Sequence, residues 1–206
     1  MIGILEYETA EAEAVQTAFS AVGANAQLIN SIDRLDRCSK VVLPPTSSFR
    51  SAVRFIRDRG FVTPLMRAID QRRPVLGMAQ GLHLLFDVSY EEGQHTGLGV
   101  IPGKVARFDF EGHPVEQKAT LPHRGWNQVH WSRACPLFEG IESGERFYFD
   151  HSFHAEPLDI QLVVGRSNHG IDFSAAVWSG SVVGTQFLPV QSDSAGAKVL
   201  RNFAAI

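Results

Sequence analysis

A short glycine-rich turn lies between an apolar strand pattern and a helical pattern. The turn has the sequence Gly77-x-Ala79-x-Gly81 and follows the apolar run at residues 74–78. In a nucleophile elbow, a turn of this shape projects its central side chain above the sheet, at the N-terminus of the next helix. The central residue here is alanine, which has no nucleophilic atom. The pattern therefore predicts the shape of a catalytic turn without its reactive group.

Serine and histidine side chains offer a second way to assemble a nucleophile and a base. The candidate nucleophiles are Ser47, Ser48 and Ser152, and the candidate bases are His83, His151 and His154. We place His151 and Ser152 on one strand, where adjacent side chains point to opposite faces and cannot pair. His83 lies one helical turn after Ala79 and can face the same pocket. We interpret it as a pocket or core residue, and expect no replacement amidase.

Composition excludes several other functions. The chain has 206 residues, of which 44% are hydrophobic and 20% charged, as in ordinary folded domains. A formal net charge of −3 gives no general attraction to nucleic acid or to an anionic membrane. Cys38 and Cys135 are too few for a disulfide scaffold and have no metal-ligand spacing, so we interpret both as ordinary thiols. We expect a cytoplasmic protein with no metal, cofactor, nucleic-acid partner or membrane contact.

The elements that position the turn alternate between strand and helix in the first half of the chain. Short apolar strands are predicted at residues 2–5, 26–29, 40–43 and 74–78, with helical patterns between them. Thr63 and Pro64 are interpreted as the N-cap and the first residue of one helix. Leu82, Leu85 and Phe86 are assigned to the helix after the turn. Apolar strands alternating with helices predict a parallel sheet covered on both faces.

The second half of the chain changes character. Glycines separate short strand patterns such as residues 104–108, 147–149 and 175–178, and a helix is expected at about 194–203. No proline-rich, serine-rich or charged linker divides the two halves. We therefore predict one domain over residues 1–206, with hairpins added to the sheet.

Arginines are concentrated between residues 50 and 73. Arg50, Arg54 and Arg57 are spaced so that they share one helix face. The simple interpretation is a solvated surface. The alternative is a docking surface for an acidic partner or a phosphate-bearing ligand.

Several motifs together resemble the class I glutamine amidotransferases, which use a catalytic triad. Within that family, the chain is most similar to the glutaminase subunit of imidazole glycerol phosphate synthase, and the resemblance covers nearly the whole chain. The motifs are Pro74-Val-Leu-Gly-Met78, Gly97-Leu-Gly-Val-Ile-Pro-Gly-Lys-Val105, Pro122-His-Arg-Gly-Trp-Asn127, residues 147–153, Gly184-Thr-Gln-Phe-Leu-Pro189 and Leu200-Arg-Asn-Phe203. The resemblance implies a three-layer α/β/α fold with a mainly parallel sheet and an antiparallel extension.

The same resemblance implies a Cys-His-Glu triad that hydrolyses the glutamine side-chain amide. Matched position by position, the cysteine corresponds to Ala79, the histidine to Leu188 and the glutamate to Val190. All three residues are apolar here. We therefore expect a degenerate triad and no glutaminase activity.

The former substrate pocket and oxyanion region are expected to contain Pro45, Thr46, Ser47, Gly77, Gln80 and His83. Pro45 has no N–H group, so it cannot donate a hydrogen bond if it lies at the oxyanion position. A glutamine that contacts the substrate in the family corresponds to His83. These departures also point to lost glutaminase chemistry.

The family's partner is a (β/α)₈ cyclase subunit, and its contact residues correspond to Trp126 and Asn127. The alternative for Trp126 is that it is a core residue. We predict a non-catalytic pseudoenzyme of histidine biosynthesis that forms a heterodimer with a cyclase-like subunit, with Arg50, Arg54 and Arg57 contributing to the contact. Two alternatives remain open: a synthase subunit that works with ammonia supplied from elsewhere, and a pocket repurposed for a small ligand.

Overall fold

The computed structural model describes residues 1–113 and 119–206. Its strands are β1 (Ile2–Leu5), β2 (Ala26–Ile29), β3 (Lys40–Leu43), β4 (Val75–Met78), β5 (Phe86–Ser89), β6 (His95–Thr96), β7 (Ile101–Arg107), β8 (His123–Trp131), β9 (Glu145–His151), β10 (Phe153–Pro157), β11 (Val163–His169), β12 (Ile171–Ser179) and β13 (Val182–Thr185). Its α-helices are α1 (Thr9–Ala21), α2 (Ile32–Asp36), α3 (Phe49–Asp58), α4 (Val62–Asp70), α5 (Gln80–His83) and α6 (Asp193–Ala205). Three short 3₁₀ helices are present in the described ranges, η1 (Pro136–Phe138), η2 (Ile160–Leu162) and η3 (Pro189–Gln191).

The strands form one continuous sheet whose centre is parallel. Its main path runs β2-β1-β3-β4-β13-β12-β10-β7-β5-β6, and β11, β8 and β9 extend it from β12. The strands from β2 to β13 along this path pair in parallel. Beyond β13, antiparallel pairing dominates, with β5 and β7 as a parallel exception. The predicted parallel sheet with an antiparallel extension is confirmed.

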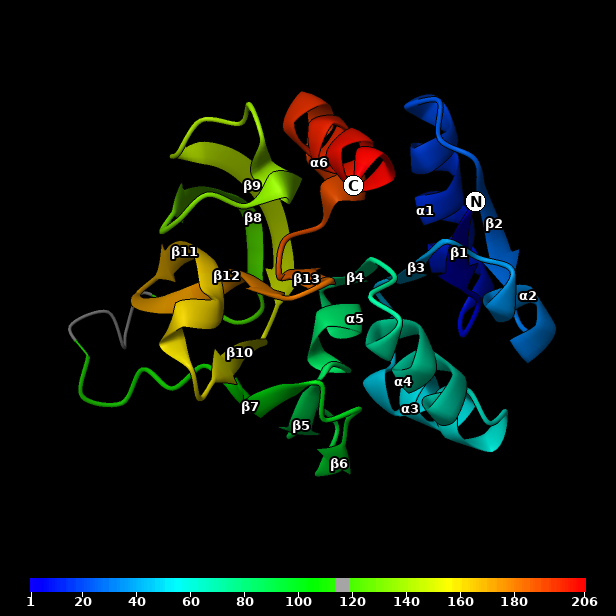
Figure 1. The fold of residues 1–206 in the computed structure, drawn as a ribbon. Coiled ribbons are helices and arrows are strands. Elements are labelled where there is room, and N and C mark those ends of the chain that lie inside the picture. The colour runs from blue at the N-terminus through cyan, green and yellow to red at the C-terminus, as the bar shows by residue number, and fades with distance from the viewer. Residues whose placement is uncertain (114–118) are drawn as a thin grey trace.

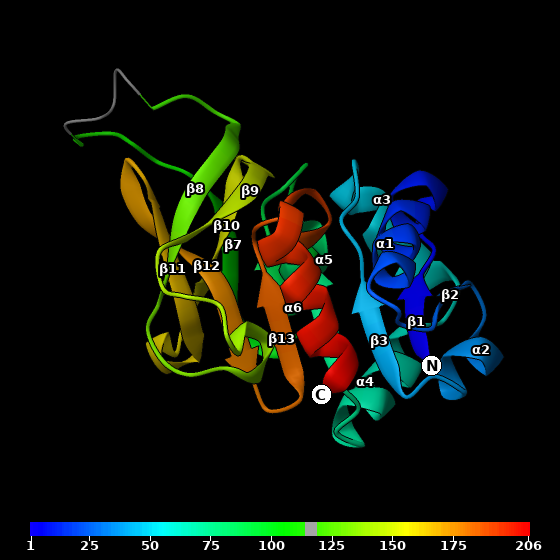
Figure 2. The same ribbon diagram turned by 90° about the horizontal axis from the view of Figure 1, so that it is seen from above.

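Helices cover both faces of the parallel centre. Helices α1 and α6 lie on one face, and α3, α4 and α5 lie on the other (Figure 1). Seen from above, α6 lies in front of β13 and α1 lies beside it (Figure 2). Alternate residues of β3 pack into two separate apolar cores, one on each face of the sheet. Val42 packs with Phe19 and Phe203 in one core, and Val41 and Leu43 pack in the other. The buried strands therefore need to be apolar on both faces, which explains their continuous apolar sequences.

Strands β4 and β13 are neighbours and end together. Met78 lies opposite Thr185 in their parallel register. Because both strands end at the same edge, the segments that follow them, starting at Ala79 and Gln186, emerge side by side. This edge is where ligand sites form in open parallel sheets.

Two predicted helix boundaries are wrong. Helix α4 begins at Val62 with Phe61 as its N-cap residue, so Thr63 is not the cap and Pro64 is the third helical residue. Proline is tolerated there because the first N–H groups of a helix have no intrahelical partner. The helix after Ala79 ends at His83, and Phe86 begins β5, where it pairs with Ile101 of β7. Strand pairing with a later segment overrides the local helical pattern.

In the two described ranges, no helix has both the length and the apolar character needed to cross a membrane.

Candidate functional site

The turn at Ala79 has the backbone geometry of an elbow. Ala79 adopts φ 48° and ψ −112°, a left-handed conformation that is unfavourable for any residue with a Cβ. Its N–H donates to the Thr185 carbonyl oxygen at 2.7 Å. A Cβ at Gly81 would lie 2.0 Å from the Leu43 carbonyl oxygen, and one at Gly77 would lie 2.6 Å from that of Gly81. Both glycines are therefore required for the close packing of α5 against the strands.

The two other positions that the resemblance assigns to a triad carry apolar side chains. Leu188 is buried, and its N–H donates to the Tyr148 carbonyl oxygen at 2.9 Å. Val190 lies in η3 and packs against the core that contains Phe187. Ala79, Leu188 and Val190 offer no atom that can attack an amide or transfer a proton.

The segment after β3 uses its hydrogen-bond donors within the chain. Pro45 has no N–H, and the Thr46 N–H faces the side-chain oxygen of Gln80 at 3.5 Å. The N–H and the hydroxyl of Ser47 both donate to the Glu8 carboxylate, at 2.9 Å and 3.0 Å. Burial disfavours the charged form of Glu8, but hydrogen bonds from Ser47 and its neighbours outweigh burial and lower the pKa of this carboxyl. Pro45, Thr46 and Ser47 therefore leave no free N–H or O–H group directed at residue 79 that could stabilise an oxyanion.

A second network fills the base of the elbow. His83 is buried and donates from Nδ1 to the Glu91 carboxylate at 2.9 Å. Its Nε2 lies 2.9 Å from the side-chain oxygen of Gln186. The other Glu91 oxygen accepts from the Gln80 amide at 3.4 Å. Thr46, Gln80, Glu91, His83 and Gln186 thus form one continuous chain of polar contacts.

A cavity of about 390 Å³ remains beside this network. Its lining consists of Glu11, Pro45, Thr46, Ser47, Gln80, Arg124, Asp150, Leu188 and Gln191. The structure therefore brings together Pro45, Thr46, Ser47 and Gln80 of the predicted pocket, together with Leu188. Gly77 lies beneath α5 and His83 within the polar network, so neither lines the cavity.

Several residues of this region were missed from the sequence, and four of them hold it together through polar contacts. Glu8 and Glu91 accept the hydrogen bonds described above, and Arg124 and Asp150 form an ion pair at 3.1 Å in the cavity wall. None has a local sequence signal, because each meets its partner only through strand pairing or loop packing. The Arg124–Asp150 pair follows from the register of β8 and β9, in which these residues lie opposite each other.

The candidate serines do not form a nucleophile–base pair. Ser47 is bound to Glu8, and Ser48 caps α3 by accepting from the Ser51 N–H at 3.2 Å. Ser152 lies at a bend between β9 and β10, so the prediction that it shares a strand with His151 is wrong. The backbone turns there because β9 pairs with β8 whereas β10 pairs with β7. Across the described part of the chain, no serine hydroxyl is hydrogen bonded to a histidine ring.

Trp126 lies on the surface of the β8–β9 ribbon. Its side chain is 39% exposed and meets the Tyr148 ring edge-on, with the ring centroids 6.1 Å apart. The alternative that Trp126 is a core residue is wrong. Asn127, its neighbour, donates to the Asn168 carbonyl oxygen at 2.7 Å and is tied into the fold.

A hydrogen-bonded histidine pair lies beneath this ribbon. His151 donates from Nδ1 to the Phe153 carbonyl oxygen at 2.9 Å, which fixes its proton on Nδ1. His151 Nε2 then accepts from His123 Nδ1 at 3.0 Å, and His123 Nε2 can accept from the Asn127 amide at 3.3 Å. Burial, with a smaller contribution from His169, lowers the pKa of His123 to about 4. Burial also lowers the pKa of His151, so both rings are neutral at neutral pH.

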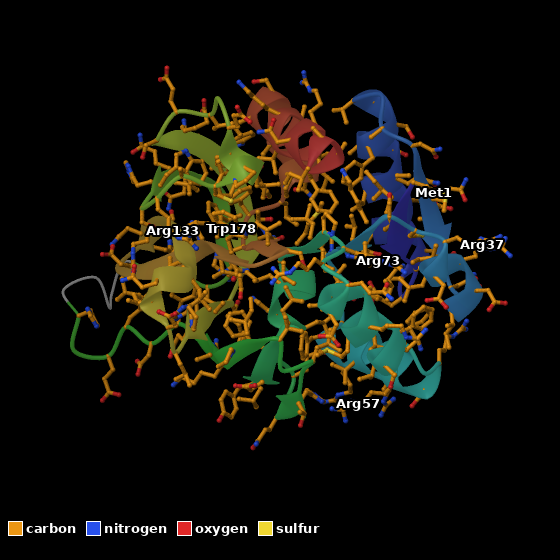
Figure 3. The ribbon with its side chains drawn as sticks, in the orientation of Figure 1. Met1, Arg37, Arg57, Arg73, Arg133 and Trp178 are labelled. Atoms are coloured by element: carbon orange, nitrogen blue, oxygen red, sulfur yellow. The ribbon has the colours of Figure 1, made fainter. Side chains whose placement is uncertain are left out.

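The three arginines of α3 are all exposed, but they differ in their contacts. The Arg50 and Arg57 side chains donate to the carbonyl oxygens of Glu92 and Thr96, next to the β5–β6 hairpin. Figure 3 shows the Arg57 side chain at the outer surface of the molecule. Arg50 and Arg57 therefore help to hold the hairpin against α3, while Arg54 extends from the same face. No group of three or more His, Cys, Asp or Glu side chains within residues 1–113 and 119–206 could hold a metal ion.

Comparison with known proteins gives consistent results. Residues 11–206 match the family model described as glutamine amidotransferase class-I. The chain is 38% identical over 203 residues to the imidazole glycerol phosphate synthase subunit HisH of Syntrophotalea carbinolica, covering 98% of both chains. It is 39% identical to the HisH subunit of Geobacter metallireducens, covering 98% of this chain and 97% of the relative.

Two solved structures share the fold at low sequence identity. One, described as a glutamine amidotransferase, has a TM-score of 0.74 at 17% identity and covers 100% of this chain and 99% of its own. The other, PurLQS from Thermotoga maritima, has a TM-score of 0.75 at 18% identity, with 98% and 96% coverage.

Proposed function

The chain belongs to the class I glutamine amidotransferase family, and we propose that it is a non-hydrolytic subunit of the HisH type. In this proposal it binds a (β/α)₈ cyclase-like partner and releases no ammonia from glutamine. It is then a pseudoenzyme whose surviving function is assembly of a heterodimer.

The proposal rests chiefly on the elbow. The strained backbone at Ala79 and the two glycines that permit it are present, while the side chains at residues 79, 188 and 190 are apolar. A change that only inactivated the nucleophile would leave a histidine and a carboxylate beside it. A buried polar group without a hydrogen-bond partner lowers stability by about 1–3 kcal/mol. Apolar side chains at all three positions avoid this loss.

The polar contacts around the elbow support the same function. The Thr46 N–H faces Gln80, and Ser47 is held by Glu8, so these donors have partners before any substrate arrives. An oxyanion needs donors that are preorganised and unoccupied. Binding a glutamine amide here requires these internal contacts to break first.

The exposed surface of β8 and β9 supports the part of the proposal in which the chain binds a partner. Trp126 is exposed and packs on Tyr148, and partly exposed aromatic side chains are enriched among residues that anchor interfaces. The relatives at 38% and 39% identity are named as subunits of a synthase. An exposed surface tryptophan, in a chain whose triad positions are apolar, fits a function in binding rather than in catalysis.

Co-purification with a cyclase subunit from the same organism tests this proposal. We expect a stable complex at low and at physiological salt with the wild-type chain, and weaker binding with Trp126→Ala. Arg54→Ala is expected to change mainly the association rate and its salt dependence, because rim charges act on encounter. Absence of any complex with the wild-type chain under both conditions contradicts the subunit function. In that case the cavity of about 390 Å³ favours a pocket repurposed for a small ligand.

A further inference from the structure

A second cavity, of about 800 Å³, lies at the opposite edge of the sheet from the elbow. Its lining consists of Trp131, Ser132, Arg133, Ala134, Cys135, Pro136, Phe138, Glu139 and Trp178. Trp178 pairs with Val183, near the start of β13, whereas the elbow follows the end of that strand's neighbour, β4. The cavity is therefore separate from the region of Ala79 and Leu188.

The aromatic walls of this cavity are fixed in position. Trp131 stacks on Phe138 with centroids 4.0 Å apart and an interplanar angle of 8°. The indole N–H of Trp131 donates to the Ile141 carbonyl oxygen at 3.0 Å, and that of Trp178 donates to the Gly180 carbonyl oxygen at 2.8 Å. Because both indole N–H groups are satisfied by the backbone, the two tryptophans present only apolar surface to a ligand.

Arg133 supplies the positive charge. Its guanidinium carbon lies 4.8 Å from the ring centroid of Trp178, and one of its nitrogens donates to the Trp178 carbonyl oxygen at 3.1 Å. The two labelled side chains lie next to each other in Figure 3, and Trp178 belongs to β12. Arg133 is exposed, and within the part of the chain that the structure describes it forms no ion pair with a carboxylate. A guanidinium has five N–H donors in one plane, so most of them remain available to an anion.

The remaining lining groups narrow the choice of ligand. Burial raises the pKa of Cys135, so its side chain is a neutral thiol that adds apolar surface. Among the lining residues, Arg133 and Glu139 are the two that carry a charge, and Glu139 directly follows η1. Flat aromatic groups stack on guanidinium planes as well as on aromatic rings. A volume of about 800 Å³ lies within the range of small-molecule sites, which is roughly 300–1,000 Å³.

We propose that this cavity binds a small planar aromatic anion. The aromatic part of the ligand lies against Trp178, Arg133 and the apolar wall, and its carboxylate, sulfonate or phosphate group accepts hydrogen bonds from Arg133. The site is independent of the partner surface and of the elbow, so it stands whether or not the chain binds a cyclase.

A pair of matched fluorescent probes tests the proposal on the full-length protein. The anionic probe is 8-anilinonaphthalene-1-sulfonate, and the neutral control is N-phenyl-1-naphthylamine, which has the same rings without the sulfonate. We expect saturable binding of the sulfonate probe at one site, with quenching of tryptophan fluorescence. The variants are Arg133→Gln, Trp178→Leu and Trp178→Phe, with Arg37→Gln as a control at an exposed arginine elsewhere.

The expected pattern separates charge from apolar contact. Arg133→Gln should lower the binding affinity for the sulfonate probe about tenfold, which is the loss expected for a charge-assisted hydrogen bond. It should change the affinity for the neutral probe much less. Trp178→Leu should lower the affinity for both probes, and Trp178→Phe should bind both more tightly than Trp178→Leu does. Arg37→Gln should change neither. Near-UV circular dichroism identifies any variant that has lost native packing, since such states bind the sulfonate probe without a specific site.

Three results overturn the proposal: no saturable binding by the native wild-type protein, equal binding of the two probes, or unchanged sulfonate affinity in natively packed Arg133→Gln.

Discussion

The N–H of Ala79 donates to the carbonyl oxygen of Thr185 at 2.7 Å, joining the end of β4 to the end of β13. This bond helps to hold Ala79 in a left-handed conformation that a non-glycine residue adopts at a cost of about 1–2 kcal/mol. The elbow therefore persists as part of the sheet edge, although its side chain performs no chemistry.

Replacing Ala79 by glycine tests that strain. Glycine removes the penalty of the left-handed backbone, which offsets the lost methyl contact and the greater entropy of the unfolded chain. We expect Ala79→Gly to leave the free energy of unfolding nearly unchanged. The control Ala175→Gly, at a buried alanine in β12, should lower it by about 1.5 kcal/mol. Equal losses at both positions in urea unfolding would show that Ala79 is unstrained.

Restoring the thiol alone should not restore catalysis. In Ala79→Cys, position 188 is still leucine, and the ring nitrogens of His83 face side-chain oxygens of Glu91 and Gln186, each at 2.9 Å. With no free base beside it, the new thiol should have a pKa near the usual ~8.5, and triad members act as a unit. The measurements are the pH dependence of alkylation by iodoacetamide and the rate of glutamate release. Rapid alkylation at pH 6, or turnover, would mean that a base has been overlooked.

Trp126→Ala should separate partner binding from folding. Because Trp126 is 39% exposed, the variant should lose about 1 kcal/mol or less of unfolding free energy. If it anchors the interface, binding to the cyclase subunit should weaken by about 2 kcal/mol or more. Tyr90→Ala is the matched control, since Tyr90 is an exposed aromatic residue after β5. Calorimetric titration and thermal unfolding provide the two values; large destabilisation by Trp126→Ala would contradict a surface role.

Acid should weaken the fold through the histidine pair. Burial, followed by the charge of His169, lowers the folded-state pKa of His123 from 6.5 to about 4. Between these values the unfolded chain binds more protons than the folded chain, so the free energy of unfolding falls as the pH falls from 6.5 to 4. His123 alone accounts for roughly 3 kcal/mol of this loss, and the lowered pKa of His151 acts in the same direction.

Chemical unfolding between pH 4 and 7 measures this effect. His123→Gln should flatten the pH dependence, while the same change at the exposed His130 should leave it as in the wild type. Identical pH profiles for wild type and His123→Gln would show that the pKa of His123 is the same in the folded and the unfolded chain.

Local patterns in the sequence were enough to predict the strands and the turn that surround the site. Apolar runs such as residues 40–43 and 74–78 became strands because both faces of the central sheet are buried, and glycines 77 and 81 marked the elbow. Phe86 and Ser152 were misassigned because strand pairing with distant segments determined their conformation. The contact of Glu8 with Ser47 joins segments 39 residues apart, and that of Glu91 with His83 joins the end of α5 to the turn after β5, so neither follows from the spacing of a helix or a strand.

Glutamate release from glutamine by the purified chain, alone and with a cyclase subunit from the same organism, tests the central claim most directly. With Ala79, Leu188 and Val190 at the three triad positions, we predict no release above buffer in either case, and no covalent label at residue 79 from a glutamine-analogue electrophile. Release that scales with protein concentration and disappears in Ser47→Ala or Ser152→Ala would contradict the account and assign amidase chemistry to a serine.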